Sequence, residues 1–343
     1  MKYPTILKAF FLFALAVPFG AEAVAATETA APPTCKGVNV LDELKSKNPA
    51  LHKEITDEGE KFKNGKALLW RIEKEGVADS YLFGTVHITD PRVHKLSEPT
   101  KAAFNSSRIL ILEAVDLNEA AMGKAMMSVM PQSMFNPLGG KTLTDYLTKD
   151  EMAQAIKISA GMGFPAEIVK LVKPWLVAIS MALPPCEVNR AKAGLISLDA
   201  RLEADAKKQG KPAMGLETPE QQLKAMASIS LDAQIAWLKS SIELYERSED
   251  FMETMVQLYI NRNLGVMFPL SIKISKDPKG AQMAMESFQQ TLIDTRNHGM
   301  AEGSKPEIDK GNAFVAVGAL HLGGDQGLVE LYRKAGYKVT AME

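Results

Sequence analysis

Short apolar runs, bounded by glycine, proline or charged residues, occur near both ends of the chain. Runs of this kind, four to eight residues long and rich in branched and aromatic side chains, indicate β-strands. The runs that predict strands are Ala67–Glu73, Asp79–Phe83, Ser107–Glu113, Lys211–Leu216, Phe314–Val317 and Tyr337–Thr340. Because only Lys74–Ala78 separates the first two, and this segment includes Gly76, we expect those two strands to form a hairpin.

Between the predicted strands, apolar residues recur at the spacing of amphipathic helices. The predicted helical segments are Val40–Asn64, Ser97–Phe104, about 117–206, Ser230–Asn263, Ala281–Arg296 and Leu328–Ala335, with Gly336 at the C-cap of the last. Strands at both ends of the chain, with helices between them, predict an α/β fold. We expect a single domain over residues 40–343, with a helical block at about 117–206 and 219–300.

Two of the predicted strands are followed by the same pattern, Gly-x-x-His. The run before Gly84 leads to His87, and the run before Gly318 leads to His321. Glycine permits backbone angles and close approaches that other residues resist, so the chain can turn sharply at both places. Each histidine is therefore expected at the carboxyl edge of its strand, where open α/β sheets usually hold their sites.

Two glutamates end other apolar runs in a similar way. Glu113 follows Ile109–Leu112, and Glu217 follows a run that ends at Leu216. If the four runs belong to one sheet, two imidazoles and two carboxylates converge near one edge. Such a set can bind a borderline metal ion or perform general acid–base chemistry. The alternative is that each histidine is a structural residue, hydrogen-bonded to nearby backbone.

Other familiar motifs of catalysis and nucleotide binding do not occur in the sequence. There is no His-Glu-x-x-His helix, no Gly-x-Ser-x-Gly elbow and no phosphate-binding Walker loop. The net charge is −1, so nothing in the composition indicates binding to nucleic acid or to an anionic membrane surface.

The N-terminus has the pattern of a cleaved secretory signal over residues 1–26. Lys2 and Lys8 give a positive start, the apolar stretch Ala9–Val17 follows, and small residues then offer cleavage sites between Val24 and Thr27. The apolar stretch is short for a membrane span, although an uncleaved anchor is the alternative. Residues 27–39 are expected to be a flexible segment. We therefore expect an exported protein, periplasmic or secreted, with no stable membrane insertion after signal removal.

The chain has two cysteines, Cys35 and Cys186. In an exported chain an even number of cysteines indicates a disulfide bond, so we expect these two to be joined. The alternative is two unrelated buried thiols.

Methionine is unusually frequent, at 18 residues. Met122, Met126 and Met130 lie four apart and therefore share one face of a helix, and Met127 and Met134 add to this surface. The face is expected to pack in the core or in a lid. A groove for an apolar peptide or lipid is the functional alternative, because methionine surfaces adapt to varied partners.

Five separate motifs, in this order, resemble the TraB/GumN family, which includes the Tiki proteases. The motifs are Gly84-Thr85-Val86-His87, the strand ending at Glu113, Gly215-Leu216-Glu217-Thr218, Arg296-Asn297 and Val317-Gly318-Ala319-Leu320-His321-Leu322. The resemblance extends from about Leu68 to Val339. One departure is visible, since many members have an aromatic residue after the Arg-Asn pair, where this chain has His298.

The resemblance implies a Tiki/ChaN-like α/β fold, with a central mixed sheet formed from both ends of the chain. It also implies a metal-dependent protease. His87 and His321 match the family histidines, Glu113 and Glu217 match its acidic positions, and Arg296 matches its arginine.

From the residues and the resemblance together, we predict a metal-dependent hydrolase that cleaves peptide or related amide bonds in a peptide or protein substrate. His87 and His321 would bind one divalent ion, either Glu113 or Glu217 would complete the site, and the other glutamate would activate the attacking water. Arg296 would hold a substrate carboxylate or stabilise the oxyanion. Zinc, manganese and cobalt all suit this donor set. The alternatives are a non-catalytic peptide- or haem-binding envelope protein and a purely structural role.

Overall fold

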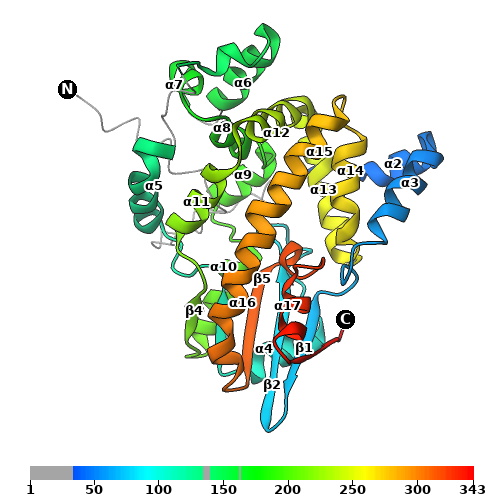
Figure 1. The fold of residues 1–343 in the computed structure, drawn as a ribbon, viewed down its shortest axis with the longest axis vertical. Helices are drawn as coiled ribbons and strands as arrows, with labels where there is room; N and C mark the ends of the chain where they lie inside the picture. Colours follow the sequence, from blue (N-terminus) through cyan, green and yellow to red (C-terminus); the bar gives the residue numbers. More distant parts are fainter. Residues whose placement is uncertain (1–33, 134–139, 162–163) are drawn as a thin grey trace, which may run out of the picture.

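The computed structural model describes residues 34–133, 140–161 and 164–343 (Figure 1). The predicted signal sequence, most of the segment 27–39 and Met134 lie outside the described residues, as does the side chain of Met130. Within the described part, no helix is both long enough and apolar enough to cross a membrane.

A six-stranded mixed sheet forms the centre of the fold, in the order β4-β3-β5-β2-β1-β6. The strands are β1 Leu69–Lys74, β2 Val77–Thr85, β3 Ile109–Leu112, β4 Ala213–Gly215, β5 Ala313–Gly318 and β6 Lys338–Ala341. Neighbours in β4-β3-β5-β2 are parallel, whereas β1 is antiparallel to both β2 and β6. The prediction of an α/β fold with a mixed sheet from both ends of the chain is therefore confirmed.

The central strands β3 and β5 are almost entirely buried because helices cover both faces of the sheet. Along β5 the side chains alternate between two apolar clusters, as the two-residue period of a strand requires. Phe314 and Ala316 belong to the cluster with Phe104 and Leu202, whereas Val315 faces the opposite cluster. Continuous apolar runs of this kind are typical of parallel strands covered on both sides.

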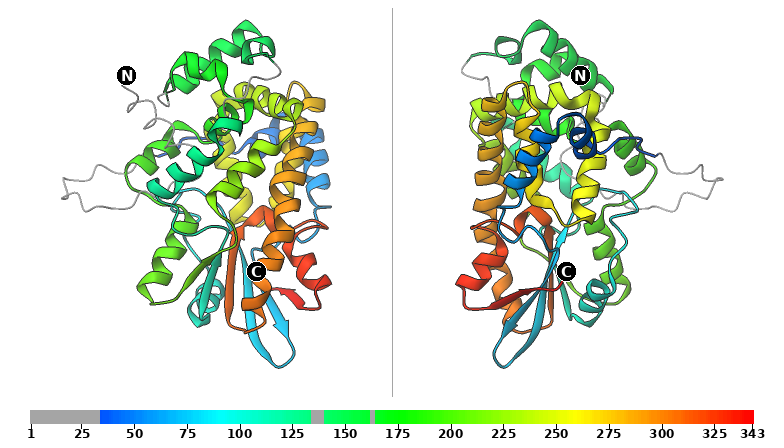
Figure 2. Two further views of the ribbon diagram at one scale, coloured as in Figure 1. Left: turned by 60° about the vertical axis from the view of Figure 1, so that its left-hand side comes forward. Right: turned by 90° about the vertical axis from the view of Figure 1, so that its right-hand side faces the viewer.

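Helices make up most of the remaining chain. The N-terminal and strand-connecting helices are α2 Val40–Lys47, α3 Pro49–Gly59, α4 Glu98–Ser106, α10 Leu198–Lys208, α16 Thr295–Ile308 and α17 Leu328–Lys334. The helical block contains α5 Glu119–Ser133, α6 Lys149–Gly161, α7 Ala166–Leu171, α8 Pro174–Ser180, α9 Pro185–Lys192, α11 Pro219–Ser228, α12 Leu231–Leu244, α13 Ser248–Ile260, α14 Met267–Lys273 and α15 Pro278–Phe288. Figure 2 shows α4 and α10 along one face of the sheet and α16 and α17 along the other.

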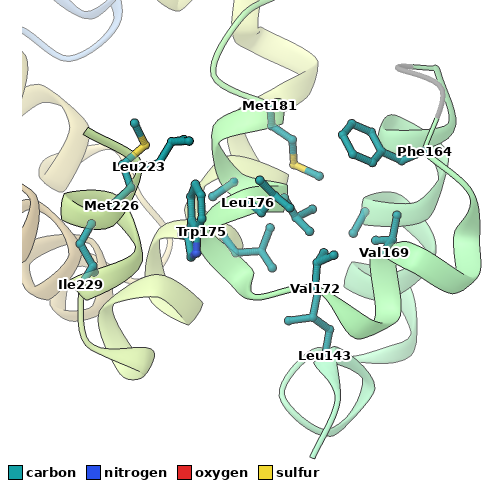
Figure 3. Close-up of a cluster of buried hydrophobic side chains, with 14 of the residues drawn as sticks. Leu143, Phe164, Val169, Val172, Trp175, Leu176, Met181, Leu223, Met226 and Ile229 are labelled. Atoms are coloured by element: carbon teal, nitrogen blue, oxygen red, sulfur yellow. The ribbon is translucent and has the colours of Figure 1, made fainter. Parts of the chain in front are cut away.

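The helical block has its own apolar core around Trp175, which is fully buried. Figure 3 shows Trp175 and Leu176 of α8 between Leu223 and Met226 on one side and Phe164 on the other. In the view of Figure 1, this block lies above the sheet. Helices of the block therefore cover the edge of the sheet that faces them.

Two methionines of the predicted helix face lie in this core. Met122 and Met126 are 4% and 6% exposed, which agrees with core packing, while Met127 is 61% exposed. The methionine side chains that contact the core are therefore the two that lie four residues apart. Because both are buried, Met122 and Met126 do not support the alternative of a groove for an apolar peptide or lipid.

A disulfide bond joins Cys35 to Cys186, as predicted, with their Cα atoms 5.3 Å apart. It fixes the chain before α2 to the start of α9. The segment also hydrogen-bonds to α13, where Thr254 Oγ1 accepts from the Val40 N–H at 2.8 Å. The N-terminal segment is thus tied to two helices of the block.

Three predicted helical segments differ from the structure. Val40–Asn64 forms two helices, α2 and α3, which Asn48 separates, and the second ends at Gly59. The segment Ser230–Asn263 is divided by a 3₁₀ turn at Tyr245–Arg247. The helix expected to end at Arg296 instead continues through a π-helical segment, Gln289–Asp294, into α16. Gly299, Gly303 and Pro306 disfavour a helix there, but packing of buried residues such as Met300 against the sheet outweighs this propensity.

Candidate functional site

Four of the five predicted site residues, all except Arg296, lie at one edge of the sheet, after four neighbouring strands. Glu217 follows β4, Glu113 follows β3, His321 follows β5 and His87 follows β2. All four strands are parallel, and Thr85 of β2 is paired with Gly318 of β5. The carboxyl ends of parallel strands meet at the same edge, so segments more than 200 residues apart in the sequence converge there.

The two glycines of the Gly-x-x-His patterns provide close approach rather than unusual backbone angles, since neither has a positive φ. A Cβ at Gly84 would lie 2.9 Å from Cβ of Ala319, in the turn before His321. A Cβ at Gly318 would lie 3.1 Å from Oε1 of Glu113 and 3.3 Å from Nε2 of His87. Gly84 lets the two histidine loops pack together, and Gly318 leaves room for the site.

Both histidines face the same carboxylate oxygen. Oε1 of Glu113 lies 3.7 Å from Nε2 of His87 and 3.6 Å from Nε2 of His321. The same oxygen accepts a hydrogen bond from the Gly318 N–H at 2.6 Å. The two imidazoles therefore converge as predicted, and Glu113 rather than Glu217 is the carboxylate between them.

The opposite nitrogen of each imidazole is held by an acceptor oxygen. Nδ1 of His87 lies 2.8 Å from Oδ2 of Asp199, whose other oxygen accepts from Thr85 Oγ1 at 2.6 Å. Nδ1 of His321 lies 2.7 Å from Oδ1 of Asn297. Because both partners accept, Nδ1 carries the proton in each ring, and Nε2 is the atom directed toward Glu113.

Asp199 is a site residue that the sequence did not reveal. It lies in the first turn of α10, after the N-cap Ser197, whose side chain accepts from the Ala200 N–H. An aspartate in the first turn is common because it interacts well with the helix dipole, so its sequence context indicates nothing more than a helix start. Asn297 had been identified only as part of the Arg296-Asn297 motif.

Arg296 joins the two glutamates. Its Nε lies 3.0 Å from each oxygen of Glu217, and its Nη2 lies 2.6 Å from Oε2 of Glu217 and 2.7 Å from Oε2 of Glu113. Its Nη1 donates to the carbonyl oxygen of Leu292 at 2.9 Å and lies 3.4 Å from Nε2 of His321. The guanidinium donors are thus committed to groups of the protein. This does not agree with the expectation that Arg296 binds a substrate carboxylate.

Burial and charge set the protonation of the central residues. Burial lowers the pKa of His321 to about 4, although Glu113 acts in the opposite direction. Desolvation at the cavity wall also opposes a charged His87, although its side chain is 48% exposed, but the carboxylates of Asp199 and Glu113 outweigh this effect and raise the pKa of His87 well above its ordinary value. For Glu113, burial is outweighed by His321, His87 and Arg296, which together hold its pKa well below the usual range. Glu113 is therefore held as an ionised, buried carboxylate between the two imidazoles.

A cavity of about 440 Å³ opens onto this cluster. His87, Glu113, Arg296 and His321 line it, together with Glu187, while Glu217 does not. Most of the remaining wall is apolar, from helices of the block and from the π-helical segment before Arg296. Polar groups at one end of a mostly apolar pocket are the usual composition of a small-ligand or catalytic site.

The donor atoms at the cavity suit a divalent metal ion in kind. Two imidazole Nε2 atoms and a carboxylate oxygen are nitrogen and oxygen ligands of the type that zinc uses, and oxygen acceptors orient both rings from behind. Among the residues that the structure describes, however, no three histidine, cysteine or acidic side chains are already arranged to hold an ion. The guanidinium of Arg296, 2.7 Å from Glu113, occupies part of the surroundings.

The fold and site define an α/β protein whose polar centre lies where the carboxyl ends of the four parallel strands of a mixed sheet meet a helical block. The chain belongs to the TraB/PrgY/gumN family, whose model matches residues 68–341. This confirms the resemblance that the five motifs indicated. No solved structure matches the chain at a significant level.

Curated relatives are distant but align along most of the chain. A "Metalloprotease TIKI homolog" from Nematostella vectensis is 24% identical, over 82% of this chain and 68% of its own length. "Metalloprotease TIKI2" from Xenopus tropicalis is 22% identical, over 80% of this chain and 59% of its own length. "Uncharacterized protein YbaP" from Shigella flexneri is 22% identical, over 76% of this chain and 90% of its own length. The match therefore spans less than two thirds of the Xenopus relative.

Proposed function

We propose that this protein is an exported, metal-dependent hydrolase that cleaves peptide bonds. The observation that carries the proposal is the convergence of His87 and His321, each through Nε2, on one oxygen of Glu113. Two relatives named as metalloproteases support the same reading. Export is supported by the Cys35–Cys186 disulfide, since such bonds persist in oxidising compartments.

His87, His321 and Glu113 are the residues proposed to hold the metal. A divalent ion there would polarise the scissile carbonyl and lower the pKa of water toward about 7. Asp199 and Asn297 hold a proton on each Nδ1, so that Nε2 of His321, and Nε2 of His87 once it has lost its proton, would be the atoms to bind the ion. The apolar wall of the cavity excludes solvent and positions the substrate beside the two histidines.

Glu217 and Arg296 are proposed as positioning residues rather than as catalytic residues. Glu217 does not line the cavity, and both of its oxygens accept from Arg296. Arg296 in turn holds Oε2 of Glu113, which leaves Oε1 facing the two imidazoles. In this arrangement Glu113 is the acidic ligand, and Glu217 fixes the arginine that orients it.

Hydrolysis of an internally quenched peptide mixture by the purified exported protein tests this proposal. Cleavage should stop after treatment with a chelator and return on addition of zinc, manganese or cobalt. The exported protein should also begin between Val24 and Thr27, as N-terminal sequencing would show. Cleavage that is unaffected by the chelator would contradict metal dependence.

The competing function is a non-catalytic peptide- or haem-binding protein that uses the same cavity. The observation that favours it is that no three histidine, cysteine or acidic side chains of the described residues are close enough together to hold an ion. Binding of peptide or haem without cleavage, in the presence of each of the three metals, would support this function instead.

A further inference from the structure

A second cavity, of about 250 Å³, lies within the helical block. Its wall comes from α12, α13, α14 and α15 and from the end of α8. It shares Ala182, Trp237, Met255 and Met267 with the larger cavity that opens onto His87 and His321. Because the same four side chains line both spaces, they form the partition between the second cavity and the candidate site.

The second cavity is lined mainly by apolar side chains. Among the residues that the structure describes, no charged side chain lines it. Several hydroxyl groups do, but those of Ser241 and Ser271 donate to carbonyl oxygens of their own helices, each at 2.9 Å. Thr254 Oγ1 donates to the Asp250 carbonyl oxygen and accepts from the Val40 N–H. These hydroxyls are satisfied within the protein, so the space favours an uncharged occupant.

The charged side chains that the structure describes in the wall of the larger cavity, His87 included, are already paired within the protein. Glu187 accepts from the Thr89 backbone N–H at 2.5 Å and from its hydroxyl at 3.0 Å. Arg296 is committed to Glu113 and Glu217. A charged substrate residue placed in either cavity would therefore lose its hydration without gaining a partner.

Two of the partition residues, Met255 and Met267, are only partly buried. Methionine side chains are unbranched and flexible, so they can move to admit groups of different shape. Two neighbouring spaces divided by such a partition can take two side chains that share one face of an extended peptide, such as those at positions i and i+2. One unbroken acyl chain would need a single continuous tunnel.

We propose that the 250 Å³ cavity is a specificity subsite that takes one bulky, uncharged side chain of the peptide substrate, aliphatic or aromatic. This inference rests on the proposed peptide hydrolysis at the neighbouring site. Burial of one large apolar side chain corresponds to a preference of about tenfold to 100-fold in affinity or in kcat/KM.

The test measures the binding of fluorescein-labelled hexapeptides, so it does not depend on their cleavage. In each peptide, one position carries leucine, phenylalanine, glycine, lysine or aspartate, and the remaining positions are glycine or alanine. Fluorescence anisotropy with the wild-type protein should show one position at which leucine or phenylalanine binds at least about tenfold more tightly than lysine or aspartate. Absence of such a position would overturn the proposal.

Ser240→Phe places a ring into the second cavity from α12, because Ser240 lines that cavity but not the larger one. It should remove most of the preference for the bulky residue while retaining binding of the glycine peptide. Asp232→Phe is the matched control, since Asp232 is exposed on the same helix and lines neither cavity. An unchanged preference in Ser240→Phe would overturn the proposal. Should Ser240→Phe melt far below wild type, Ser248→Leu fills the same cavity from α13 and is judged by the same criterion.

Two further outcomes separate this inference from the proposed function. If the protein prefers certain peptides but cleaves none of them in the presence of zinc, manganese or cobalt, the subsite is supported and the proposed hydrolase activity is contradicted. Decanoate that competes with every peptide, without any difference among residues, would identify an acyl-chain site and overturn the subsite.

Discussion

Asp199 lies 2.8 Å from His87, between Oδ2 and Nδ1, although 112 residues separate the two in the sequence. The second oxygen of Asp199 accepts from Thr85, the last residue of β2. One carboxylate thus connects the start of α10 with both the strand and the loop that carry His87. It fixes the proton on Nδ1 and directs Nε2 toward Glu113.

We predict that Asp199→Asn lowers the affinity for the metal by about 10- to 100-fold, the usual effect of losing the partner of a metal-binding histidine. The amide can present its NH₂ group to Nδ1, which favours the wrong tautomer. Competition titration with a zinc chelator measures the affinity. Asp205→Asn is the control, because Asp205 lies on the same helix and pairs with Arg201 and Lys208. Equal metal affinities in the two variants would show that Asp199 does not contribute to metal binding.

The four residues that end strands could be found from the sequence because their position follows from local pattern. His87 and His321 each follow an apolar run by the same Gly-x-x step, and Glu113 and Glu217 follow two other such runs. Once the runs are parallel neighbours in one sheet, their carboxyl ends meet. Correct prediction of these strands was therefore enough to predict that the four side chains lie close together.

Other parts of the site depend on contacts between distant segments. Asp199 has the context of an ordinary helix start, and nothing near it in sequence indicates His87. The role of Arg296 depends on the π-helical segment before it and on its pairing with Glu217, 79 residues away. The continuation of α16 past Gly299 follows from tertiary packing, which local propensity does not contain.

Arg296→Met should destabilise the protein by about 3–5 kcal/mol, because it leaves the Glu113 and Glu217 carboxylates buried without their partner. Urea denaturation measures the loss. Adding Glu217→Gln to Arg296→Met removes one of the two stranded charges and should recover part of the stability. A single variant as stable as wild type would show that the three side chains do not form the buried network described here.

Gly318→Ala should reduce activity and metal affinity while the protein still folds. The added methyl group would lie 3.1 Å from Oε1 of Glu113 and 3.3 Å from Nε2 of His87, so the ligands would have to shift. Gly299→Ala is the matched control, because a Cβ at this exposed position in α16 meets no atom within 4 Å. It should leave activity unchanged and stabilise the helix by up to about 1 kcal/mol. Full metal affinity in Gly318→Ala would refute the close approach.

Asp90 provides a pH-dependent part of the stability near the loop that carries His87. Burial raises the pKa of Asp90, but Arg92 and Arg190 outweigh this effect and lower it below its ordinary value. Its contribution is therefore complete above the unfolded-state pKa of about 3.9 and is lost as the pH falls through the lower folded-state value. Asp90→Asn should reduce the urea midpoint at pH 7 and flatten its decline below pH 4. Asp150→Asn, at an exposed position, should leave the decline as in wild type.

Metal binding to the purified exported protein tests the central claim most directly. Titration with zinc, manganese or cobalt should reveal one ion per chain for at least one of these metals. His87→Ala and His321→Ala should each weaken that binding strongly, while His298→Ala, at an exposed position on α16, should not. Binding that persists unchanged in His87→Ala and His321→Ala, or no binding of any of the three metals to the wild-type protein, would contradict a metal site at these residues.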